Sequence, residues 1–119
     1  MRELIKIRAS QINGCAYCID MHSKDARAAG ETEQRLYLLS AWRETTLFTP
    51  RERAAMAWTE AVTRLEGQHV DDEVYSLARS EFSEAELAAL TLAVVEINGW
   101  NRFAIAFQYE VGNYRQKAK

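Results

Sequence analysis

The chain has 119 residues, of which 48% are hydrophobic and 27% are charged, and its formal net charge is −2. This length predicts a single domain over residues 1–119 with one hydrophobic core. Acidic and basic residues are interleaved, which argues against nucleic acid or an anionic membrane as a partner. No apolar run approaches the roughly 20 residues that would cross a bilayer.

The first six residues, Met1 to Lys6, have charges scattered through them, so we expect no secretory signal. The expected location is therefore the reducing cytoplasm. A cysteine pair in that compartment is more often redox-active or metal-binding than a permanent disulfide.

The first half of the chain predicts three helices. Apolar residues at helical spacing indicate a helix over about residues 2–12, and Asn13-Gly14 ends it because both residues tolerate a left-handed backbone. A second helix is predicted from about residue 15 to residue 29, and it stops at Gly30. Thr32 caps a third helix, which carries Leu36, Leu39 and Trp42.

The second half predicts three more helices. Thr49, followed by proline and then by Glu52, is a strong start signal for the fourth. A shorter helix follows over about residues 71–81. Ser83 and Glu86 form a second capping box, which opens the last and longest helix. Strand-like alternation is absent, so the predicted fold is all-α with about six helices.

The last helix is apolar on almost every side between Leu87 and Phe107. A surface helix of a small monomer would show one polar face. We therefore expect neighbouring subunits to cover one side of this helix, which makes the protein a homo-oligomer. The alternative is a central helix wrapped by the other five.

The two cysteines form Cys15-x-x-Cys18, and His22 follows four residues after the second. Because a helix turns about 100° per residue, these three side chains fall within roughly a 60° arc. A helix start after Asn13-Gly14 places Cys15 in the first turn, where backbone N–H groups and the helix dipole lower the pKa of a thiol. Such a pair can also close a disulfide.

Glu3 would stand about 18 Å from Cys15 along the axis of one straight helix. Only a reversal at Asn13-Gly14 could bring it back towards His22. In that arrangement the carboxylate orients the imidazole, and the imidazole takes the proton from Cys18.

Glu3, then eleven residues, then Cys15-Ala16-Tyr17-Cys18-Ile19-Asp20-Met21-His22, resembles the core motif of the alkylhydroperoxidase-D-like branch of the carboxymuconolactone decarboxylase family. Residues 6–15 and Asn98-Gly99-Trp100-Asn101-Arg102 are similar to its uncharacterised peroxidase-related members. The resemblance covers nearly the whole chain.

This resemblance implies an all-helical fold that assembles into trimers or hexamers. It also implies hydroperoxide reduction with no cofactor beyond a redox-active Cys15–Cys18 disulfide. By the same resemblance Glu3 and His22 form the proton relay, Cys18 attacks the peroxide and Cys15 resolves the sulfenic acid. A lipoamide- or thioredoxin-like dithiol would restore the pair. Helix-end electrostatics alone would instead nominate Cys15 as the nucleophile, whereas the position of His22 favours Cys18.

Two positions depart from the family pattern. Tyr17 stands where the best-known members carry a second histidine, so a phenol replaces part of their relay. Relatives usually carry more chain ahead of the motif glutamate, and a helix that starts at Glu3 is expected to fray.

Other interpretations of the same residues stay open. The cysteines could be buried without any chemistry. Zinc could bind Cys15, Cys18 and His22, with His69 or Glu3 as the fourth ligand, although three ligands on one helix make an awkward tetrahedron. The protein could also be a dithiol–disulfide oxidoreductase or a non-catalytic redox-sensing assembly. Lactone decarboxylation is disfavoured, because that chemistry does not use a cysteine pair.

Three further polar residues are assigned ordinary roles. His69 follows Gly67-Gln68 in a predicted loop, so we expect it to be solvated. Asn98 and Asn101 lie within an apolar helix and need partners if they are buried. A hydrogen bond between helices or subunits is favoured over a place in a pocket.

Overall fold

A computed structural model describes residues 1–116 of the chain. Within these residues it contains six α-helices, one 3-10 helix and no strand, which confirms the all-α prediction. The elements are α1 (Arg2–Asn13), α2 (Ala16–Ala28), α3 (Glu33–Leu38), η1 (Leu39–Glu44), α4 (Pro50–Thr63), α5 (Asp72–Glu81) and α6 (Glu84–Ala106). None of the helices in residues 1–116 is both long enough and apolar enough to span a membrane.

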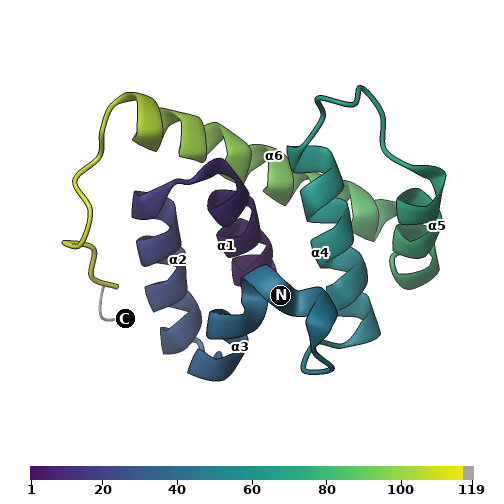
Figure 1. The fold of residues 1–119 in the computed structure, drawn as a ribbon, viewed down its shortest axis with the longest axis horizontal. Helices are drawn as coiled ribbons and strands as arrows, with labels where there is room; N and C mark the ends of the chain where they lie inside the picture. Colours follow the sequence, from purple (N-terminus) through teal and green to yellow (C-terminus); the bar gives the residue numbers. More distant parts are fainter. Residues whose placement is uncertain (117–119) are drawn as a thin grey trace.

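Helix α1 is the central element of the fold. It packs against α2, α4 and α6, which surround it in Figure 1. Its side chains Leu4, Ile5 and Ile7 are almost wholly buried. The position of α1 decides where the site lies, because its first turn carries Glu3 and its end leads directly to Cys15.

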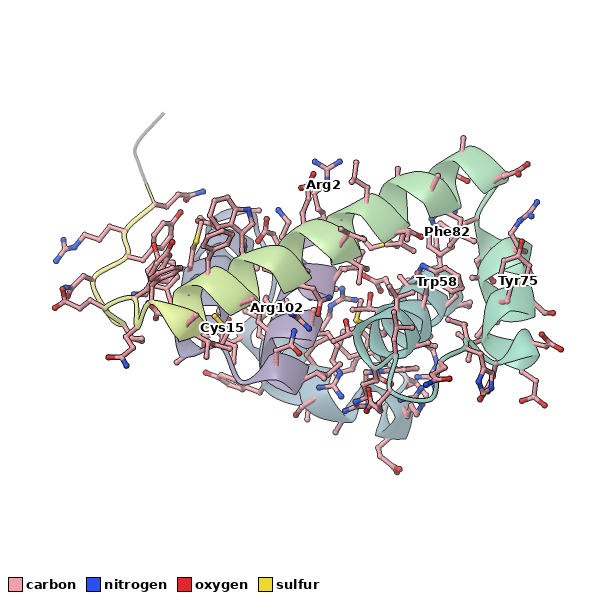
Figure 2. The ribbon with its side chains drawn as sticks, turned by 90° about the horizontal axis from the view of Figure 1, so that it is seen from above. Arg2, Cys15, Trp58, Tyr75, Phe82 and Arg102 are labelled. Carbon is pink, nitrogen blue, oxygen red and sulfur yellow. The ribbon has the colours of Figure 1, made fainter. Side chains whose placement is uncertain are left out.

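The apolar side chains form two clusters. The larger one joins α1, α4, α5 and the first half of α6. Its members Trp58 and Phe82 lie on the right in Figure 2, near Tyr75 of α5. The smaller one contains both cysteines with Ala9, Ile97 and Ala104. Cys15 lies beneath the C-terminal half of α6 in the same view.

The predicted helix starts are confirmed, but the third helix is divided. Both capping boxes are formed, at Thr49 with Glu52 and at Ser83 with Glu86. After α3 the chain continues as the 3-10 helix η1, with a non-helical backbone at Ala41. Leu39 and Trp42 of η1 are both buried in the core.

A buried ionic network joins α1 to α4 and η1. Glu60 accepts hydrogen bonds from Arg8 at 2.8 Å and from the Trp42 indole at 3.0 Å, and it also pairs with Arg43. Burial raises the pKa of Glu60, but these hydrogen bonds outweigh it and hold the pKa below the ordinary value. The paired charges connect α1, α4 and η1 through one carboxylate.

Helix α6 has one buried apolar side and one exposed apolar side. Val94, Ile97 and Ala104 are buried against the fold, whereas Leu92, Val95, Trp100, Phe103 and Phe107 are exposed. The alternative of a central α6 wrapped by the other helices is therefore wrong, because α1 occupies that place. Oligomerisation through the exposed side stays a prediction.

Candidate functional site

The chain reverses direction at Gly14, as the sequence predicts. Gly14 has a left-handed backbone, with φ 72° and ψ 31°. Its N–H donates to the Gln11 carbonyl at 3.3 Å, and the Cys15 N–H donates to the Ser10 carbonyl at 2.9 Å. These two bonds define a Schellman motif. The turn lays α2 back against α1.

Cys15 is the capping residue of α2 rather than a member of its first turn. Its backbone is extended, with φ −86° and ψ 95°, and its sulfur accepts the Cys18 N–H at 3.4 Å. Both cysteines are free thiols, and they are only 1% and 3% exposed. Cys15 thus satisfies one of the backbone donors that a helix start leaves unpaired.

Glu3 and His22 meet across the α1–α2 interface. Glu3 Oε2 lies 2.9 Å from His22 Nδ1, and His22 is buried. The hydrogen bond from His22 lowers the pKa of Glu3, burial opposes this, and Lys6 adds to the lowering. Glu3 is therefore a carboxylate that accepts a hydrogen bond from the Nδ1–H of His22. With Nδ1 protonated, Nε2 is the atom of a neutral imidazole that can accept another proton.

A cavity of about 360 Å³ adjoins this pair. Its walls come from α2, from the second half of α6 and from the segment after α6, with Lys6 at one side. The lining residues are Lys6, Tyr17, Cys18, Met21, His22, Glu96, Ile97, Trp100, Ala104 and Tyr109. Cys18 lines the cavity and Cys15 does not, so a molecule in the cavity meets Cys18 first.

The Cys18 thiol is almost wholly buried. Burial raises the pKa of Cys18 well above that of an ordinary thiol, and the adjacent Cys15 raises it further. The side chains of Asn101 and Ser10 act in the opposite direction, because they can hydrogen-bond to the sulfur. Cys18 is consequently a neutral thiol at rest, and any nucleophilic role requires a base to take its proton.

Asn101 and Ser10 belong to a buried polar cluster between α1 and α6. Asn101 donates to Ser10 Oγ at 2.9 Å, and Asn13 donates to the side-chain oxygens of Asn101 and Asn98 at 2.9 and 2.8 Å. The predicted bond between helices is confirmed for both α6 asparagines. Ser10 was not identified from the sequence, although it follows the buried Ile7 by three residues, which places a polar side chain on the buried face of α1.

The ligand set considered for zinc does not come together. Among residues 1–116, Glu3, His22 and Asp25 form the one group of three or more His, Cys, Asp or Glu side chains whose ligand atoms all lie within 4.8 Å of one another. This group includes neither cysteine. His69 is solvated as expected, with 70% of its side chain exposed, and its ring lies 3.1 Å from Asp71.

The two α6 asparagines provide a matched test of the surroundings of Cys18. In a Cys15→Ser background Cys18 is the only thiol, and the pH dependence of its alkylation reports its apparent pKa. We expect Asn101→Ala to raise this pKa by up to about one unit, because a donor to the thiolate is lost. Asn98→Ala removes a comparable amide from the same cluster and should leave the pKa unchanged. Equal shifts in the two variants would contradict the assignment.

Comparison with known proteins gives one matching family and two curated relatives. Residues 1–61 match the Carboxymuconolactone decarboxylase family. The Bacillus subtilis uncharacterized protein YdfG is 50% identical over 105 residues, which is 88% of this chain and 71% of YdfG. The Escherichia coli uncharacterized protein YnjA is 27% identical over 94 residues, which is 79% of this chain and 51% of YnjA.

Solved structures extend the likeness over almost the whole fold. An Agrobacterium tumefaciens protein of unknown function, described as a candidate antioxidant defence protein AhpD, superposes with a TM-score of 0.91 at 42% identity. The match covers 95% of this chain and 77% of that one. An uncharacterized peroxidase-related protein from Silicibacter has the same fold, with a TM-score of 0.82 at 24% identity over 94% of this chain and 59% of its own. The chain belongs to the carboxymuconolactone decarboxylase family, in its alkylhydroperoxidase-D-like branch.

Proposed function

We propose that the protein is a cysteine-based hydroperoxide reductase. The observation that carries the proposal is the Glu3–His22 hydrogen bond beside a cavity that Cys18 lines. In this arrangement Cys18 is the nucleophile, His22 is the base and Glu3 orients the base, which are the three roles that an activated thiol requires. The peroxidase-related description of the Silicibacter relative and the antioxidant description of the Agrobacterium relative point the same way.

In the first step Cys18 attacks the peroxide. His22 Nε2 takes the Cys18 proton, and the Glu3 carboxylate stabilises the imidazolium that forms. The thiolate sulfur forms a bond to one peroxide oxygen while the O–O bond breaks. The leaving alkoxide receives the proton from His22, so the products are an alcohol and Cys18 sulfenic acid.

In the second step Cys15 resolves the sulfenic acid. The Cys15 thiol gives up its proton as its sulfur attacks the Cys18 sulfur, the S–S bond forms, the S–O bond breaks, and the leaving hydroxide takes up that proton and departs as water. The capping position of Cys15 supports this role, because the hydrogen bond from the Cys18 N–H already holds the Cys15 sulfur beside that residue. No bound cofactor takes part in either step.

In the last step an external dithiol reduces the disulfide by thiol–disulfide exchange. The pair is 1% and 3% exposed, so the reductant has to reach it through the cavity. This geometry favours a slender lipoamide-like dithiol over the surface thiols of a folded thioredoxin-like protein.

A dithiol–disulfide oxidoreductase is the second candidate. It is favoured by the Cys-x-x-Cys pair at the start of α2, which is a common position for disulfide-exchange cysteines. The depth of both sulfurs favours a small peroxide over a protein disulfide as oxidant. A non-catalytic redox-sensing assembly would oxidise and reduce the pair reversibly without consuming peroxide.

We also propose that the exposed apolar side of α6 packs against other copies of the chain in a trimer or hexamer. Trp100, Phe103 and Phe107 form a contiguous aromatic row there, with ring centroids 5.9 and 6.0 Å apart. All three are more than half exposed in the single chain. A row of this size is rare on the surface of a monomer.

The two cysteines should separate in a single-turnover experiment. We expect Cys18→Ser to abolish peroxide consumption by the reduced protein. Cys15→Ser should retain the first step and accumulate a sulfenic acid, which a dimedone adduct reports by mass spectrometry. A sulfenic acid in Cys18→Ser would exchange the two roles. Rapid disulfide reduction by the parent protein without peroxide consumption would favour the second candidate.

Removal of the Glu3 carboxylate should slow proton transfer from Cys18. We expect Glu3→Gln to lower the rate of peroxide consumption at neutral pH by roughly ten- to hundredfold, because His22 loses the carboxylate that orients its ring and stabilises the imidazolium formed in the first step. The deficit should shrink as pH rises, since Cys18 then ionises without help. Glu33→Gln, at an exposed glutamate on α3, is the control. A parallel pH–rate profile for Glu3→Gln and the parent would remove Glu3 from the relay.

The mass in solution tests the assembly. Light scattering should give three or six times the 13.6 kDa of one chain. Phe103→Glu should lower this mass, because a charge cannot be buried unpaired in an apolar contact. Leu77→Glu changes an exposed leucine on α5 and should leave the mass as it was. A parent protein of 13.6 kDa would contradict the proposal.

A further inference from the structure

The chain turns back sharply after α6. Gln108 has a left-handed backbone, with φ 54°, which is uncommon for a residue other than glycine. Its N–H donates to the Ile105 carbonyl at 3.3 Å, and the Tyr109 N–H donates to the Ala104 carbonyl at 3.0 Å. This is the same pair of bonds as at Gly14. The turn sends the following residues down beside α2, as the yellow segment of Figure 1 shows.

Tyr109, the first residue of the returning segment, forms part of the Cys18 cavity. Its ring meets the Tyr17 ring edge-on, with centroids 5.3 Å apart, and both rings line the cavity. Edge-to-face contacts of this kind hold aromatic pairs in one geometry. Tyr109 therefore supplies a wall that α2 and α6 do not provide.

The far end of the segment is fastened to α2. The Tyr114 hydroxyl donates to Asp25 Oδ1 at 2.7 Å, and Lys24 Nζ donates to the Tyr114 carbonyl at 3.1 Å. The hydrogen bond to Asp25 raises the pKa of Tyr114 to about 12, so the phenol keeps its proton at neutral pH. These contacts are the only polar bonds between side chains of α2 and the described part of this segment.

We propose that residues 107–116 form a strap that closes one side of the Cys18 cavity, and that Tyr109 limits the width of the hydroperoxide that reaches Cys18. Tyr114 is a positioning residue, which holds the strap through Asp25. Cys18 is only 3% exposed, so reagents reach it through the cavity that Tyr109 narrows. The substrate in this statement rests on the proposed function, but the strap limits any reagent of comparable width.

Alkylation tests the strap without relying on peroxidase activity. The full chain in a Cys15→Ser background is treated separately with iodoacetamide and with a fluorescein maleimide. We expect Tyr114→Phe to speed the reaction with the bulky maleimide by about threefold or more, because a charge-assisted hydrogen bond is lost and the strap opens more often. The iodoacetamide rate, which follows Cys18 ionisation, should be unchanged. Tyr109→Ala should speed the maleimide reaction further.

Tyr37→Phe is the matched control. The Tyr37 hydroxyl also donates to a carboxylate, Glu33 at 3.1 Å, but it lies on α3 and lines no part of the Cys18 cavity. We expect both alkylation rates of this variant to equal those of the parent. Equal maleimide rates in Tyr114→Phe and Tyr37→Phe, or an unchanged maleimide rate in Tyr109→Ala, would overturn the strap.

Turnover then tests the link to the proposed function. In the Tyr109→Ala protein with both cysteines present, the ratio of kcat/KM for cumene hydroperoxide over hydrogen peroxide should rise. An unchanged ratio in an active enzyme would overturn Tyr109 as the residue that limits substrate width. If the parent reduces neither peroxide, the proposed function fails, and the alkylation rates still decide whether the strap exists.

Discussion

The reversal at Gly14 is the constraint on which the site depends. Two backbone hydrogen bonds, to Gln11 and Ser10, close the end of α1, and the left-handed backbone of Gly14 directs α2 back along it. Glu3 and His22 are far apart on one chain, and they meet because these helices lie side by side. A residue with a Cβ would strain this backbone, and a β-branched one most of all. The proposed roles of Glu3, His22 and the cysteines all depend on how this turn places α2 against α1.

Burial, rather than the helix start, decides the resting state of the thiol that lines the cavity. A helix dipole stabilises a nearby negative charge by about 0.3–1 kcal/mol. Burial can shift a pKa by up to about 3–5 units, and each unit is about 1.4 kcal/mol. The larger effect wins at Cys18, whose pKa is raised despite its place in the first turn of α2. A buried thiol with a raised pKa needs a nearby base, and His22 held by Glu3 meets that need in the proposed mechanism.

Helix α6 and the turn that follows it have three roles. Its buried side provides Ile97 and Ala104 to the cysteine cluster. Its exposed aromatic row is the surface proposed for contact with other copies. After α6 the chain turns at Gln108, which brings Tyr109 to the cavity. Tyr109 lies near the C-terminal end of the sequence, whereas Cys15 lies near the N-terminal end. Two reversals of the same type, at Gly14 and Gln108, thus bring residues from both ends of the chain to one site.

The sequence by itself predicted the helix starts, and with the family resemblance it indicated that Glu3 would pair with His22 if the chain reversed at Asn13-Gly14. Capping boxes, Asn13-Gly14 and the motif spacing are local signals, because each rests on residues within one or two helices. The tertiary structure alone decided that Cys18 lines the cavity, that Ser10 supports Asn101 and that the third helix divides after Leu38. Ser10 and Asn101 are 91 residues apart, and Trp42 reaches Glu60 on another helix. Such contacts depend on how helices pack, and spacing along one helix carries no information about a distant partner.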